Sequence, residues 1–198
     1  STALSTFIFA LAAVILLYAL WTDWRELRIK NHAVIALAAL TALRCVVAPE
    51  SFQWADLWLA LAVFFGAMIT YEIGLVVLGA GDLKLLSVLA LWFGWPDGAG
   101  PDFVDLLIMA GLVGLLYTVV HLIARLFYDP KPDGFPFTQV PFLFPLVARV
   151  PQRWVVAAFP YMAQDGGRTL PYGMAIVPAA LWLMHLQLGG VAGIVETF

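Results

Sequence analysis

Residues 57–82, LWLALAVFFGAMITYEIGLVVLGAGD, set the class of fold that this chain can adopt. The only charged side chains within the stretch are Glu72 and the final Asp82. A helix needs about 20 apolar residues to cross a bilayer. Asp82 directly follows Gly79-Ala80-Gly81, and ionisable groups near membrane depth are costly and usually functional. The stretch therefore predicts a membrane-spanning helix that leads into a candidate site at Asp82.

The composition supports an integral membrane protein. Of 198 residues, 63% are hydrophobic and 12% are charged, whereas soluble domains carry roughly 25% charged residues. We expect one membrane-embedded domain over residues 1–198. The single cysteine, Cys45, excludes an internal disulfide and a cysteine zinc site, and the three histidines lack metal-ligand spacing. We expect no cofactor or metal, and no nucleic-acid partner.

Apolar runs predict an all-α protein with six transmembrane helices. We expect the spans at residues 3–22, 33–48, 57–80, 83–95, 106–124 and 170–195. The first run lacks a basic start and a small-residue cleavage site, which favours a retained helix over a signal peptide. Between the last two spans, the segment 135–168 carries five prolines before residue 163. Because proline disrupts a helix interior, we expect this segment to lie along the cytoplasmic interface.

The distribution of positive charge predicts the orientation. Cytoplasmic loops collect Lys and Arg, and nine of the ten basic residues fall on one side of the expected helices. The exception is Arg44, whose side chain we expect to extend to the membrane surface. This orientation places both termini outside the cytoplasm. It also brings Asp23, which directly follows the first span, to the same cytoplasmic boundary as Asp82.

Two carboxyl groups at one membrane boundary suit an aspartyl protease. Two carboxyls held close together cannot both ionise, so they share one proton. The ionised group then takes a proton from water, and the protonated group donates to the scissile carbonyl. Gly79 and Gly81 lack a Cβ and permit close approach of the backbone.

Three motifs resemble those of type IV prepilin peptidases. Residues 23–31, DWRELRIKN, resemble the Asp-x-Arg-x-x-x-Ile-Pro-Asn segment of that family. Residues 79–86, GAGDLKLL, look like its Gly-x-Gly-Asp-x-Lys-Leu segment, and residues 171–176, PYGMAI, look like the Pro-Tyr-Gly-x-Ala-Ile that begins its last helix. The motifs occur in the family's order, with Lys30 in place of the proline.

The resemblance implies a function and a set of site residues. It implies that Asp23 and Asp82 are catalytic and that the chain cleaves leader peptides from prepilins or pseudopilins, at the cytoplasmic face of the bacterial inner membrane and among its lipids. The residues expected to shape the site are Gly79, Gly81, Lys84, Asn31, Pro171, Tyr172 and Gly173. Larger members carry a cysteine-containing domain and N-methylate the product. This chain has about ten residues between its first two spans, so we expect a peptidase without methyltransferase activity, similar to the small enzymes of Tad/Flp pilus systems.

Other functions remain open from the sequence. A proton-coupled transporter or channel could use Asp23, Glu72 and Asp82 as a relay, and a non-enzymatic protein of pilus or secretion assembly could keep the same fold. A flagellin-type or signal-peptide-type Gly-x-Gly-Asp protease is a related alternative. The substrate, the oligomeric state and the assembly of the aspartate pair without substrate also remain open.

Three other polar residues receive structural interpretations. We expect Glu72 to lie within a long helix and to form a hydrogen bond inside the bundle. We expect His185 to be a satisfied interior group, and His121 to have a structural or interfacial role near the cytoplasmic end of its helix. Attraction of a basic leader would suit the acidic residues Glu26, Asp129 and Asp133.

Overall fold

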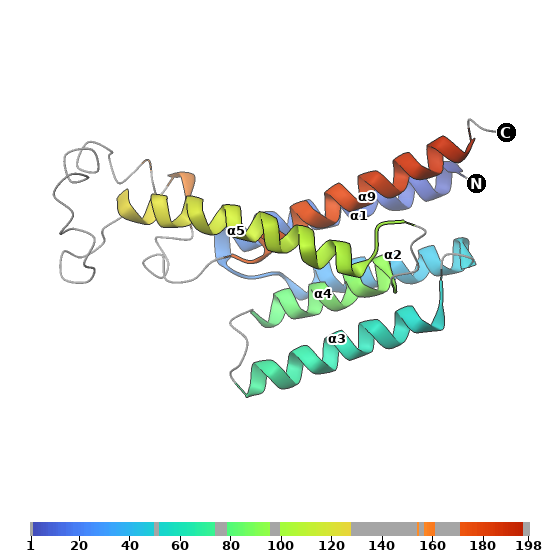
Figure 1. Ribbon diagram of the computed structural model, residues 1–198, viewed down its shortest axis with the longest axis horizontal. Helices are drawn as coiled ribbons and strands as arrows, with labels where there is room; N and C mark the ends of the chain where they lie inside the picture. Colours follow the sequence, from blue (N-terminus) through green and yellow to red (C-terminus); the bar gives the residue numbers. More distant parts are fainter. Residues whose placement is uncertain are drawn as a thin grey trace.

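A computed structural model describes residues 2–49, 52–73, 79–95, 100–127, 154, 157–160 and 171–195. Within these residues the secondary structure is helical, without a strand. The helices are α1 (Thr2–Glu26), α2 (Asn31–Val47), α3 (Trp54–Glu72), α4 (Ala80–Phe93), α5 (Phe103–Phe127) and α9 (Gly173–Val195). They run alternately in opposite directions, and both chain termini lie at the same end of the bundle (Figure 1). The prediction of an all-α protein is therefore confirmed.

Each helix of the bundle packs on a small set of neighbouring helices. α9 packs along α1 and α5, α2 packs on α1 and α4, and α3 packs on α4 at the edge of the bundle (Figure 1). Leucines from several helices, including Leu16, Leu37 and Leu89, are fully buried. Buried alanines on α1 and α9, such as Ala12 and Ala180, let these two backbones approach closely.

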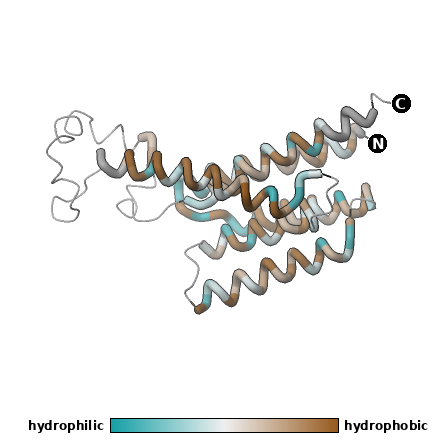
Figure 2. Tube along the Cα trace, in the orientation of Figure 1, coloured by the Kyte–Doolittle hydropathy of each residue, from teal (hydrophilic) through white to brown (hydrophobic). Residues whose placement is uncertain are grey.

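The lengths and surfaces of the helices are consistent with a multi-pass membrane protein. Three helical segments are long and apolar enough to span a membrane, namely Ala3–Glu26, Trp54–Glu72 and Phe103–Ala124. Asn31–Val47 and Gly173–Gly189 are shorter apolar helices, and α4 has 14 residues. Hydrophobic residues occur along the whole bundle (Figure 2), and large side chains such as Trp58 and Ile69 of α3 are exposed. Lipid is the solvent that such a surface suits.

The third helix is shorter than expected. α3 ends at Glu72, where the Ile73 N–H donates to the Ile69 carbonyl oxygen, and Asp82 lies in the first turn of the separate helix α4. Glu72 is exposed in the last turn, so the expected hydrogen bond inside the bundle is wrong. Apart from Glu72, residues 57–80 form a largely apolar run. Hydropathy measures solubility in lipid rather than the point where a helix ends.

Three smaller expectations also change. α1 continues to Glu26, so Asp23 belongs to its last two turns rather than to a following loop. His185 is exposed on α9 rather than interior, because hydropathy alone does not give the face of a helix. Arg44 does not extend outward. It is half-buried and donates a hydrogen bond to the Trp92 carbonyl oxygen.

Most of the segment 135–168, including the expected interfacial path, lies outside the described residues, as do Asp129 and Asp133. Of its described residues, Phe159 packs on Trp24 near the end of α1, with ring centroids 5.7 Å apart.

Candidate active site

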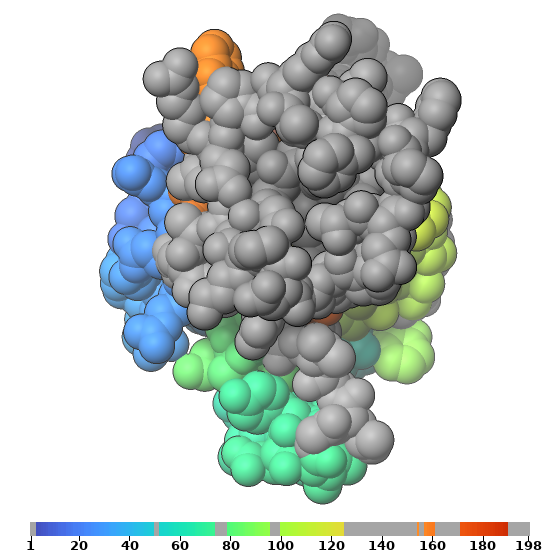
Figure 3. Space-filling view, turned by 90° about the vertical axis from the view of Figure 1, so that its left-hand side faces the viewer, coloured from blue at the N-terminus to red at the C-terminus, as the bar shows by residue number. Residues whose placement is uncertain are grey.

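The three sequence motifs meet at the end of the bundle opposite the chain termini. α1 ends there, while α4 and α9 begin there (Figure 1). Figure 3 looks onto this end, with the end of α1 and the start of α2 at one edge, α5 at the opposite edge, and α3 and α4 below. Residues far apart in the chain thereby become neighbours around Asp23 and Asp82.

Asp23 is held by the start of α9. Its side chain is buried, with 4% exposed, and its Oδ2 accepts a hydrogen bond of 2.8 Å from the Gly173 N–H. A Cβ at position 173 would lie 2.7 Å from that oxygen, so the contact requires glycine. Pro171 is fully buried, and its carbonyl oxygen accepts from the Met174 N–H as α9 begins. Tyr172 packs partly buried against the core. The motif 171–173 therefore positions a backbone donor against Asp23.

Asp82 is held by its own glycine turn. Its side chain is 6% exposed, and its Oδ2 accepts a hydrogen bond of 3.1 Å from the Gly79 N–H at the start of α4. A carboxylate in the first turn is favoured by the orphan N–H groups and the helix dipole. The other oxygen, Oδ1, is buried and has no hydrogen-bond partner within the described part of the chain. Because buried polar atoms are normally paired, this oxygen is unusual within the described part of the chain.

Close backbone contact brings the first two motifs together. A Cβ at Gly81 would lie 3.1 Å from the Ile29 Cβ and 3.4 Å from that residue's backbone N and O atoms. Lys84 Nζ donates to Asn31 Oδ1 at 3.2 Å. Asp23 and Asp82 interact electrostatically. The expected site-shaping residues of the two motifs thus contact one another, and Ile29 joins them as a residue that the sequence analysis did not single out.

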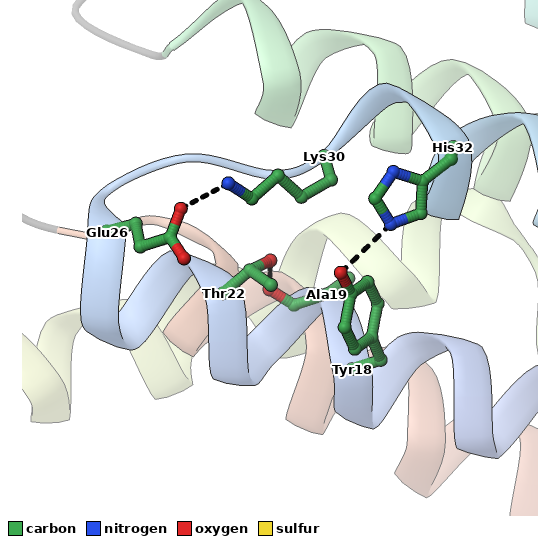
Figure 4. A network of polar contacts seen from close by, with 6 residues as sticks. All are labelled: Tyr18, Ala19, Thr22, Glu26, Lys30 and His32. Carbon is green, nitrogen blue, oxygen red and sulfur yellow. Dashed lines mark hydrogen bonds and ion pairs between the residues drawn. The ribbon is translucent and has the colours of Figure 1, made fainter.

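The connection between α1 and α2 has a defined shape. Leu27 has a positive φ of 52°, which is uncommon for a residue other than glycine, and its N–H donates to the Asp23 carbonyl oxygen at 2.9 Å. Beside it, Lys30 pairs with Glu26, and His32 Nε2 lies 2.9 Å from the Tyr18 hydroxyl (Figure 4). The left-handed residue ends α1 just beyond Asp23 and lets the chain turn so that Ile29 reaches Gly81.

Aromatic residues surround the outer side of α1 near the site. A cavity of about 380 Å³ is lined by Trp21, Trp24, Arg25, Ala157 and Pro160. The Arg25 guanidinium carbon lies 5.0 Å from the Trp21 ring centroid.

His121 is buried on α5. No group of three metal-ligating side chains occurs among the residues that the structure describes.

The geometry of the site indicates the class of protein to which this chain belongs. Two buried carboxyls at one end of an apolar helical bundle are suited to acid–base chemistry on a substrate that reaches the membrane boundary. Residues 10–119 match the type IV leader peptidase family, a match that spans more than half of the 198-residue chain and includes both aspartates. The chain therefore belongs to this family and is a peptidase similar to type IV leader peptidases. No curated protein and no solved structure matches it.

Proposed function

We propose that the protein is an aspartyl endopeptidase that removes leader peptides from prepilin-like proteins, with Asp23 and Asp82 as its catalytic pair. The observation that carries this proposal is the meeting of three distant motifs around two buried carboxyls. Gly173 donates to Asp23, and Gly79 donates to Asp82. Family membership makes a prepilin-type substrate the first candidate.

In the proposed reaction the two carboxyls share one proton. The ionised carboxylate removes a proton from a water molecule, and the water oxygen attacks the carbonyl carbon of the scissile peptide bond. The protonated carboxyl donates its proton to the carbonyl oxygen. The tetrahedral intermediate then collapses, the C–N bond breaks, and the leaving nitrogen receives a proton from the pair. The unpaired Oδ1 of Asp82 suits the water or the carbonyl oxygen in this scheme.

The proposal places the reaction at the cytoplasmic face of the bacterial inner membrane. Support comes from the positive charges at the site end of the bundle, where Arg25, Arg28, Lys30 and Lys84 lie near the helix ends. Lys and Arg favour the cytoplasmic side.

We further propose that no N-methylation accompanies cleavage, because the connection between α1 and α2 is only four residues long and the chain has one cysteine.

A cleavage assay tests the proposal. The chain is co-expressed with a small pilin precursor from the same genome, and the size of the precursor is followed on a gel. Wild type should shorten the precursor, while Asp23→Asn and Asp82→Asn should each abolish cleavage, and the double variant should be no worse than either. Asp102→Asn is the matched control, because this aspartate caps α5 at the far end of the bundle. Cleavage that persists in either single variant would reject the pair.

A further inference from the structure

A cluster at the end of the bundle away from the site joins the two helices that carry the aspartates. Phe9 belongs to α1, and Trp92 to the last turn of α4. Their rings meet edge to face with centroids 5.3 Å apart, and both side chains are buried. α1 packs mainly on α9 and α2, while α4 packs mainly on α3 and α2. This aromatic pair is therefore a direct link between α1 and α4.

Arg44 of α2 binds both sides of this link. Its guanidinium carbon lies 4.8 Å from the Trp92 ring centroid and 5.4 Å from that of Phe9. Its Nη1 donates to the Trp92 carbonyl oxygen at 2.7 Å. A cation near the carbonyls of a last turn is favoured by the helix dipole, and a planar guanidinium stacks well on aromatic rings. A flexible ammonium would not reproduce this geometry.

A buried carboxylate fixes the same end of α4. Asp56, in the first turn of α3, accepts hydrogen bonds of 2.8 Å from the Gln53 N–H and from the Trp95 N–H. Gly94, which precedes Trp95 and ends α4, has a φ of +77°. Asp56 also interacts electrostatically with Arg44. The end of α4 is thus held from α1, α2 and α3 together.

The positions along the helices connect this cluster to the site. Phe9 lies fourteen residues before Asp23, which is about 21 Å along an α-helix, and Trp92 lies ten residues after Asp82, about 15 Å. At the site end, α4 meets the α1–α2 connection through the Gly81–Ile29 contact and the exposed Lys84–Asn31 hydrogen bond. The aromatic link at the far end therefore joins the same two helices that carry the carboxyls.

We infer that Arg44 is a positioning residue for the aspartate pair, acting through its contacts with Phe9 and Trp92. This inference rests on the proposed aspartyl peptidase activity. Replacement of Arg44 by glutamine removes the stacked cation and lets α4 tilt against α1. Since a displacement of about 1 Å can cost up to 10²-fold in rate, kcat should fall while KM, which reflects contacts of the substrate elsewhere, stays near its wild-type value.

The experiment pairs kinetics with a distance measurement in lipid nanodiscs. Spin labels at the exposed positions 28 and 80, introduced as Arg28→Cys and Ala80→Cys with Cys45→Ala, report the separation of the α1 end and the α4 start. Arg44→Gln should lower kcat by about tenfold and broaden the distance distribution. Arg44→Lys, which keeps the charge and the donor, should recover part of both effects. Leu37→Ala is the control, because it removes a fully buried side chain from the same helix, about two turns before Arg44.

The inference is overturned if Arg44→Gln leaves the distance distribution unchanged, or if its kcat falls no further than that of Leu37→Ala at equal thermal stability. Should Arg44→Gln fail to fold, the comparison of Arg44→Lys with wild type decides by the same two readouts. An inactive wild type would reject the proposed function alone, because the distance measurement requires no cleavage and still decides whether Arg44 sets the spacing.

Discussion

At the scale of single residues, each buried aspartate at the site is paired with a glycine. Asp23 lies against Gly173 and Asp82 against Gly79, and in both pairs the glycine N–H donates to the carboxylate. A side chain on either glycine would approach the carboxyl oxygen, at 2.7 Å for position 173 and 3.1 Å for position 79. The two glycines therefore allow the backbone to approach a carboxylate closely, and position 173 leaves the least room for a side chain.

We predict that Gly173→Ala lowers the cleavage rate by at least about tenfold, because the added methyl group displaces Asp23 and weakens its hydrogen bond. The measurement is the initial rate of precursor cleavage at matched amounts of folded protein. Gly111→Ala is the control, since a Cβ there meets nothing within 4 Å, and it should retain the wild-type rate. Equal activity in the two variants would contradict the proposed role of the 171–173 motif.

At the scale of helices, Asp56 joins two of them. Its two oxygens accept from the amide that precedes α3 and from the amide that follows α4. In contrast, Glu72 at the other end of α3 is exposed. Glu72, which the sequence singled out on this helix, is thus peripheral. Asp56, which the sequence did not single out, is buried and connects α3 to α4.

We predict that Asp56→Ala destabilises the protein by about 2 kcal/mol, because two backbone donors lose their acceptor in a buried place. Thermal unfolding in detergent should show a lower midpoint. Asp105→Ala is the matched comparison, since among the described residues that carboxylate accepts one hydrogen bond, from the Asp102 N–H at 3.2 Å, and it should lose less. A midpoint for Asp56→Ala at or above that of Asp105→Ala would show that the connection contributes little.

At the scale of the whole molecule, alternating helix directions place both termini at one end and the candidate site at the other (Figure 1). The basic residues Arg25, Arg28, Lys30 and Lys84 gather at the site end. This distribution favours an orientation in which the termini lie outside the cytoplasm. The number of complete membrane crossings stays a prediction, because three helices meet the length and composition of a span.

We predict that an alkaline phosphatase fused to the C-terminus, or after residue 52, is active in cells, because both points lie at the end without the basic cluster. A fusion after residue 29 should be inactive, since the α1–α2 connection lies at the basic end. The readout is phosphatase activity normalised to the amount of fusion protein. Activity of the fusion after residue 29 would reverse the orientation and would place the site outside the cytoplasm.

The sequence by itself determined the class of fold and the family, for reasons of solvent and local chemistry. Apolar runs of about 20 residues, such as 3–22 and 106–124, match the length of a membrane-spanning helix, and helices cover both of them. The three motifs predicted the family, and the match over residues 10–119 confirms it. The catalytic roles of Asp23 and Asp82 stay predictions, although both lie buried where the motifs meet.

Only the tertiary structure decided the contacts between those motifs and the ends of the helices. Hydropathy gave no sign that α3 ends at Glu72, nor that His185 faces outward, because it does not record which neighbour a side chain meets. The approach of Gly81 to Ile29 and the packing of Arg44 on the rings of Phe9 and Trp92 join residues far apart in the chain. Such contacts depend on how the helices pack, and packing is a property of the assembled bundle that a local pattern does not contain.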